Sequence, residues 1–170
     1  MQLDKLCVAC FSPTHTSMKI ARAIADGTRI ARREEIDLTT DPADTPISVR
    51  NAICIVAAPV YGGLVAPVAV RRIARLRAEN SIAIPVVVYG NRDYEDALVQ
   101  LRDLLHAQGF TPLCGAAFVG EHSYSRPGMP VAEGRPDAAD LQKAAAFWGA
   151  SIRQPDAPTE PAPPSGHGCT

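Results

Sequence analysis

The sequence lacks an excess of charge of one sign, a long apolar run and a regular cysteine pattern. Its 170 residues include 17 basic and 18 acidic side chains, with a formal net charge of -1. This balance argues against a protein built mainly to bind nucleic acid or an anionic membrane. No apolar run approaches the roughly 18 residues that span a bilayer. Because residues 1–5 also lack the pattern of a secretion signal, we expect a cytoplasmic protein.

The five cysteines do not form the even, closely spaced set of a disulfide framework. Cys7 and Cys10 have the spacing of a redox CxxC motif, but they lie in an apolar run typical of a β-strand. Residues three apart in a strand point to opposite faces, so the two sulfurs should not meet. We therefore expect inert, buried thiols in a reducing compartment.

Four segments rich in apolar residues and one weaker segment, residues 34–38, predict β-strands, and helical patterns lie between them. Near-continuous apolar runs are typical of strands covered on both faces in a parallel sheet. The alternation of strand and helix predicts an α/β fold with three layers, a doubly wound five-stranded parallel sheet between helices. The predicted strands are residues 6–11, 34–38, 53–60, 84–89 and 112–119.

The predicted helices begin near Thr16, Pro67, Asp93 and Pro136. The second helix carries an arginine run, residues 71, 72 and 75, which we expect on its solvated face. The helical pattern ends at residue 152, and the following residues contain five prolines without an apolar period. The sequence thus predicts one domain over residues 1–152 and a flexible, Pro-rich tail or linker over residues 153–170.

Hydroxyl groups cluster after the first predicted strand, where a helix begins. Ligands of a doubly wound sheet bind beyond the carboxyl ends of the strands, and the N–H groups of a helix start attract anions. The absence of a GxxxxGK[ST] motif argues against a nucleoside triphosphate, which leaves a phosphomonoester held by neutral donors. A helix N-cap with spare hydroxyls is the alternative. The residues of this phosphate site are Ser12, Thr14, His15, Thr16 and Ser17.

The pattern Ser12-x-Thr14-x-x-Ser17 resembles the phosphate loop of flavodoxins, which surrounds the 5′-phosphate of FMN without a cation. The segment after the third strand is similar to the flavodoxin loop that packs on the isoalloxazine ring, and the resemblance gives Gly62 the peptide that turns toward flavin N5. Adjacent glycines allow close backbone approach to a flat ring, although a tight turn is the alternative. The candidate ring-binding residues here are Pro59, Val60, Tyr61, Gly62 and Gly63.

Two further loops supply the remaining candidate cofactor-binding residues. By position, the loop after the fourth strand is the second ring-binding loop, in which Gly90 and Asn91 offer donors to the pyrimidine edge and Tyr94 covers the ring. Arg92 is a candidate cation near flavin N1, where positive charge would stabilise an anionic reduced ring. After the fifth strand, His122 is a candidate ring neighbour or proton donor. Solvated side chains are the alternative for Arg92 and His122.

Taken together, these segments resemble the flavodoxin part of flavodoxin-ferredoxin fusion proteins of anaerobes, over residues 1 to about 152. The resemblance implies strand order 2-1-3-4-5, FMN as cofactor, and electron transfer without a catalytic acid or base. Many flavodoxins are strongly acidic, whereas the net charge of -1 favours a domain serving a tethered or dedicated partner. That partner is a redox protein or a fused ferredoxin-type module, whose cysteine cluster could begin at Cys169.

Two other functions remain open from the sequence. An FMN-dependent NAD(P)H or quinone reductase would need a pocket in front of the ring, for which residues 125–134 offer an excursion. A flavin-free interaction module would result if the phosphate loop were blocked. We expect no metal site and no nucleic acid or membrane as partner.

Overall fold

The computed structural model describes residues 3, 5–40 and 43–153. For residues 152 and 153 it describes the backbone but not the side chains. Strands and helices alternate, as the apolar pattern predicted. In chain order the elements are β1 Lys5–Cys10, α1 Thr16–Thr28, β2 Arg33–Asp37, β3 Ile47–Arg50, β4 Ala52–Tyr61, β5 Leu64–Val65, α2 Pro67–Ile73, β6 Leu76–Glu79, β7 Ile82–Tyr89, α3 Ala97–Ala107, β8 Thr111–Pro112, β9 Ala116–Val119 and α4 Ala138–Arg153.

The main sheet is parallel along the order β2-β1-β4-β7, and β8 and β9 both pair with the far side of β7. With β8 and β9 counted as one interrupted strand, this is the predicted order 2-1-3-4-5. The α/β doubly wound class is confirmed, but the sheet has seven strands rather than five, because the fifth strand is split into β8 and β9 and because β5 adds an antiparallel partner to β4.

Three local features differ from the sequence expectation. The fifth strand is broken at residues 113–115, next to Pro112, which has no N–H to donate to a continuous ladder. β3 and β6 form a separate parallel pair that the sequence analysis did not predict. The third helix begins at Ala97 rather than near Asp93, because the Asp93 carboxylate accepts the Glu95 N–H in a turn and Glu95 has φ 42°.

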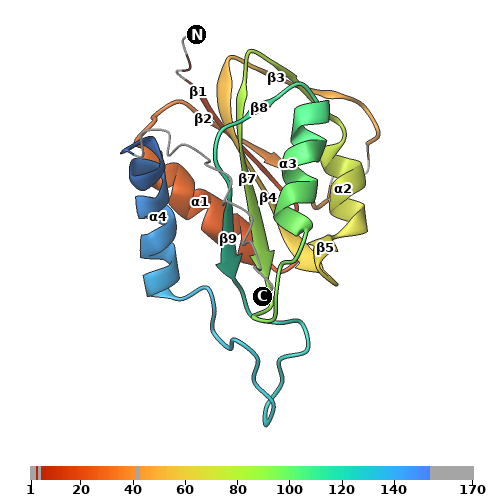
Figure 1. Cartoon of the computed structure of the whole chain (residues 1–170), viewed down its shortest axis with the longest axis vertical. Helices are drawn as coiled ribbons and strands as arrows, with labels where there is room; N and C mark the ends of the chain where they lie inside the picture. Colours follow the sequence, from red (N-terminus) through yellow and green to blue (C-terminus); the bar gives the residue numbers. More distant parts are fainter. Residues whose placement is uncertain (1–2, 4, 41–42, 154–170) are drawn as a thin grey trace, which may run out of the picture.

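Helices cover both faces of the sheet and form two cores. Figure 1 shows α1 and α4 on one face and α2 and α3 on the other. Successive residues of β1 and β4 alternate between the two cores, so Ile53 and Ile55 face α1 and α4 while Cys54 and Val56 face α2 and α3. The buried strands thus form a rigid platform, and the loops at its ends carry the polar residues.

Three of the four described cysteines are buried, as predicted, whereas Cys114 is only half-buried. Cys7 and Cys10 belong to different cores, and Cys7, Cys10, Cys54 and Cys114 are free thiols. Burial raises the pKa of the Cys10 thiol to about 12. Cys7 lies opposite Cys54 in the register of β1 and β4, and its hydrogen bond together with burial raises the pKa of Cys54 well above its usual range.

The arginine run of α2 is not the solvated face that the sequence predicted. Arg71 is exposed, but Arg72 donates to the carbonyl oxygens of Leu38 and Thr39, and Arg75 is only 8% exposed. Arg72 thereby attaches α2 to the chain that follows β2. Arg75 lies two residues beyond the end of α2, and its Nε donates to the Thr45 carbonyl oxygen. The helical pattern predicted that these arginines face outward, but it contained no information about the backbone carbonyl groups that accept their hydrogen bonds.

No helix in the described part of the chain is long and apolar enough to cross a membrane. The predicted tail, residues 153–170, and the candidate cluster cysteine Cys169 lie outside the described residues except for the last residue of α4.

Candidate functional site

Four loops meet at the edge of the sheet where the parallel strands have their carboxyl ends, the lower edge in Figure 1. Three glycines show how close these loops lie, since a Cβ atom on each would touch a side chain of a neighbouring loop. Such a Cβ would lie 2.6 Å from Thr16 Cγ2 at Gly120, 2.8 Å from His122 Cγ at Gly90, and 2.6 Å from Glu95 Cδ at Gly63. The loops after β1, β9, β7 and β4 therefore form one continuous surface in that order.

The loop between β1 and α1 has an inner and an outer set of hydroxyls. Ser12 is 4% exposed, and its Oγ accepts the N–H of Met18 at 3.1 Å. Ser17 is also buried. Thr14 is exposed, and its hydroxyl lies 3.0 Å from that of Thr16. Thus Ser12 supports the loop from within, whereas Thr14 and Thr16 offer hydroxyls to a ligand.

His15 occupies the N-cap position of α1 with φ 61° and makes no side-chain cap. This left-handed conformation brings the chain round so that the His15 N–H donates to Ser12 O at 3.1 Å. The first turn of a helix leaves backbone N–H groups without helical partners and carries partial positive charge. This end of α1 therefore suits an anion, and the outer hydroxyls of Thr14 and Thr16 lie at the same end.

The loop after β2 also contributes, although the sequence analysis did not include it. The Thr39 hydroxyl accepts the Ser12 N–H at 2.8 Å. The hydrogen bond from the Thr39 N–H, at 2.7 Å, is the main reason that the pKa of Asp37 lies below its ordinary value, and the His15 charge contributes. The signal was present in the polar run at the end of a strand that neighbours β1 in the predicted order.

The segment after β4 forms a tight hairpin instead of an open loop. Pro59, Val60 and Tyr61 belong to β4 itself, and β5 turns back antiparallel to it. Gly62 and Gly63 have φ 60° and 80°, and positive φ at both central positions is what a two-residue hairpin turn of type I′ requires. A Cβ at Gly62 would contact nothing within 4 Å, so one side of this turn is open.

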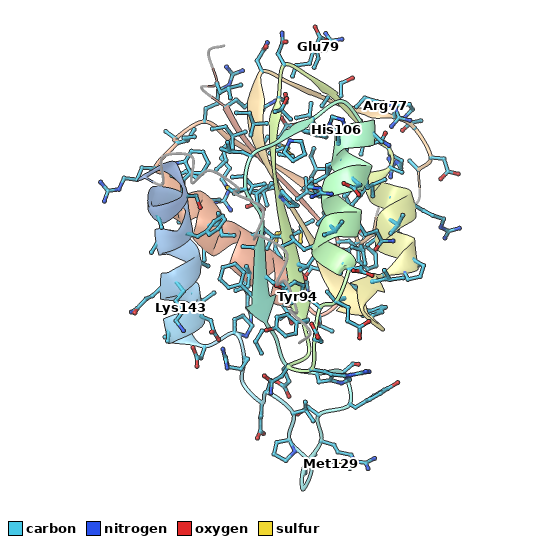
Figure 2. The ribbon with its side chains drawn as sticks, viewed as in Figure 1. Arg77, Glu79, Tyr94, His106, Met129 and Lys143 are labelled. Carbon is cyan, nitrogen blue, oxygen red and sulfur yellow. The ribbon has the colours of Figure 1, made fainter. Side chains whose placement is uncertain are left out.

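The loop after β7 presents one tyrosine inward and a charged pair outward. The ring of Tyr94 lies 5.3 Å from that of Tyr89, and Figure 2 shows Tyr94 near the carboxyl end of the strand. Asn91 takes φ 63° and is exposed. The Arg92 side chain is 86% exposed and lies 3.9 Å from Glu95. Arg92 thus faces a carboxylate in this structure.

His122 packs directly on Gly90, which joins the loops after β7 and β9. Its Nδ1 accepts the N–H of Tyr124 at 3.0 Å, so the proton of the neutral imidazole resides on Nε2. The Tyr124 ring lies 5.0 Å from the imidazole and is 81% exposed as a residue. His122 is therefore held as a hydrogen-bond donor beside the loop that the sequence proposed for the ring edge.

The excursion after β9 is an ordered extension of the site edge, with Met129 near its tip in Figure 2. Its two arms are joined by hydrogen bonds from Glu121 N to Arg135 O at 2.9 Å and from His122 N to Val131 O at 3.1 Å. Arg135 in turn binds the carboxylate of Asp140 and lowers its pKa to about 2. The start of α4 thereby anchors the excursion.

The predicted site residues thus lie on a shared edge, but they do not all present free side chains. Among the described residues, no group of three or more His, Cys, Asp or Glu side chains is arranged to hold a metal ion. An apolar cavity of about 200 Å³ lies elsewhere, between α3 and the break in the fifth strand, and none of its lining residues is a predicted site residue.

Neither a protein-family model nor a curated protein matches the sequence. Solved structures do match. Rubredoxin oxygen:oxidoreductase of the anaerobe Desulfovibrio gigas has 15% identity and a TM-score of 0.58 over 90% of this chain, which spans 38% of that protein. The flavodoxin of Streptococcus pneumonia TIGR4 has 18% identity and a TM-score of 0.53, covering 85% of this chain and 97% of its own.

An NADH:FMN oxidoreductase in its apo form also matches, with 18% identity, a TM-score of 0.55, and coverage of 91% of this chain and 92% of that one. The aligned part covers 85–91% of this chain in the three neighbours. At such low identity the likeness concerns the fold. The chain has the flavodoxin-like fold that its loop motifs predicted.

Proposed function

We propose that this domain binds FMN at the loop edge and transfers electrons to a redox partner protein. The observation that carries the proposal is the convergence of the four loops, with the outer hydroxyls of Thr14 and Thr16 at one end and the turn of Gly62 and Gly63 at the other. The first group suits a phosphate and the second a flat ring. The fold neighbours include a flavodoxin and an NADH:FMN oxidoreductase, which supports a flavin.

The phosphate and the ring of FMN each have residues that fit them. The phosphate would lie at the start of α1 against Thr14 and Thr16, with Ser12 holding the loop. The ring would lie between the glycine turn and the loop after β7. Bound FMN would supply the redox chemistry, and the protein would set its affinity and potential through backbone donors and nearby charge.

The experiment is a binding comparison of FMN with riboflavin, which lacks the phosphate. We expect the purified protein to retain FMN through gel filtration and to bind riboflavin more weakly, as measured by quenching of flavin fluorescence. Stepwise anaerobic reduction followed by absorbance then distinguishes one-electron from two-electron behaviour. Failure to bind either flavin would refute the proposal and favour a flavin-free interaction module.

A reductase is the second candidate function, and the excursion after β9 favours it. Two backbone hydrogen bonds join the arms of this segment, one of them donated by His122, and the segment extends beyond the strand ends, where it can form one wall of a substrate site. Rapid oxidation of NADH or NADPH by the FMN-loaded protein would support the reductase. Reduction only by a protein donor would support the carrier, whose partner we propose to be a dedicated or fused redox module.

A further inference from the structure

The side chain of Glu95 lies across Gly63, on the turn that the proposed function assigns to the flavin ring. A Cβ atom built on Gly63 would overlap the Glu95 carboxylate, with 2.6 Å to Cδ and 3.0 Å to Cβ. The contact therefore involves the base of the side chain as well as its tip. Gly63 is buried although it belongs to a two-residue turn at the protein surface.

The local backbone holds Glu95 in this position. Its φ of 42° is in the left-handed region, which non-glycine residues seldom adopt. Its N–H donates to the Asp93 carboxylate at 3.0 Å. One carboxylate oxygen is directed to Gly63, and the other lies 3.9 Å from the Arg92 guanidinium. The side chain is 49% exposed, so apolar burial does not explain its placement.

We propose that Glu95 covers the ring-binding face of the glycine turn in the flavin-free protein, and that it moves toward Arg92 when a flavin binds. This inference rests on the proposed function. A flat, largely apolar ring placed on Gly63 would meet an ionised carboxylate and remove its water, which is unfavourable unless the charge finds a partner. Arg92 is the available partner, because its side chain is 86% exposed and stands at a distance that can shorten.

The proposal gives Arg92 a different role from direct stabilisation of the reduced ring. Arg92 would act through Glu95, by receiving the displaced carboxylate. The two residues should therefore be energetically coupled in flavin binding, and a double-mutant cycle measures that coupling. Removal of the cover should increase the fraction of protein that is ready to bind, and apparent affinity rises with that fraction.

The test uses the full chain and measures association rates and affinities for FMN and riboflavin. Glu95→Ala is expected to raise both by roughly fivefold or more, by the same factor for the two flavins, because the cover acts on the ring they share. Glu95→Gln, which keeps the side-chain size, should gain less. Asp96→Ala is the matched control, because it also removes a carboxylate from this loop. Asp96 is the N-cap residue of α3, but its side chain makes no capping hydrogen bond.

Arg92→Gln should weaken flavin binding in the wild-type background and have no effect in the Glu95→Ala background. Equal effects of Arg92→Gln in both backgrounds would overturn the coupling. The proposal is also wrong if Glu95→Ala and Asp96→Ala behave alike, if only FMN responds, or if Glu95→Gln gains as much as Glu95→Ala. If wild type and Glu95→Ala both bind no flavin, the proposed function is wrong, and the inference about Glu95 is wrong with it.

A second measurement tests the cover without any flavin. In the ligand-free protein, the NMR shift of the Gly63 backbone amide should change in Glu95→Ala, because the carboxylate touches that residue. Asp96→Ala should leave the Gly63 shift unchanged. A Gly63 shift that is the same in wild type and Glu95→Ala, or that changes equally in Asp96→Ala, would overturn the cover. Flavin binding by wild type together with that result would separate failure of this inference from failure of the proposed function.

Discussion

Replacement of Ser12 by alanine should lower stability, whereas replacement of Thr14 should weaken FMN binding. The reason is that the phosphate loop divides its hydroxyls between an inner and an outer set. Ser12 is buried and accepts the Met18 N–H at 3.1 Å. Loss of this bond leaves a buried N–H without an acceptor, so Ser12→Ala should reduce the free energy of unfolding by about 1–2 kcal/mol. With a urea m-value of about 2 kcal/mol/M, the unfolding midpoint falls by about 0.5–1 M.

Thr14→Ala should leave stability within about 0.5 kcal/mol, because Thr14 is exposed and bonds only to the Thr16 hydroxyl. Its effect should instead fall on FMN. A hydrogen bond to a charged group contributes about 1.5–3 kcal/mol, which corresponds to a loss of affinity of about 10- to 150-fold. Riboflavin has no phosphate, so its affinity should not change.

The assay for this pair of variants is urea unfolding without ligand, followed by titration with each flavin. The reasoning is refuted if Ser12→Ala leaves the unfolding midpoint unchanged, because then the buried hydroxyl does not support the loop. It is also refuted if Thr14→Ala weakens FMN and riboflavin equally, because then this hydroxyl does not contact the phosphate.

Other substitutions test the remaining contacts. Gly120→Ala should destabilise the protein by about 1–3 kcal/mol, because its Cβ would lie 2.6 Å from Thr16 Cγ2; an unchanged urea midpoint would contradict the loop contact. Asp140→Asn should cost about 1 kcal/mol at pH 7, because Arg135 lowers the pKa of Asp140 to about 2. That contribution is present above about pH 4, the unfolded pKa, and is lost as the pH falls toward 2, so the difference in urea midpoint between variant and wild type should shrink there. Cys10, with a pKa near 12, should resist alkylation at pH 8 until the protein unfolds, and mass spectrometry of the labelled peptide would reveal any earlier reaction.

The sequence predicted the sheet class because buried parallel strands leave a strong apolar signal. Their order followed from the family resemblance, and the structure agrees with both. The broken fifth strand escaped prediction because residues 112–119 are apolar throughout, and periodicity cannot show which backbone groups find a partner. The start of α3 was misplaced because Asp93 is a good helix cap by residue type, while its carboxylate closes a turn with Glu95 instead.

The site was predictable at the level of loops and not of side-chain contacts. The rule that ligands bind at the carboxyl ends of the strands identified the four loops. Gly63 and Gly90, which contact neighbouring loops in the structure, were already predicted as site residues. Glu95 and Thr39 were missed because their importance arises from partners distant in sequence or from an unusual φ. Ser12 was identified correctly as a loop residue, but its inward orientation depends on the position of Met18.

The interruption of the fifth strand has a consequence for self-association. In the described part of the chain, β8 and β9 pair with β7 alone and form one margin of the sheet. A continuous strand over residues 111–119 would offer a long, regular row of unpaired backbone groups to another polypeptide. The break reduces this margin to segments of two and four residues, and short edge strands are one of the devices by which proteins resist edge-to-edge aggregation.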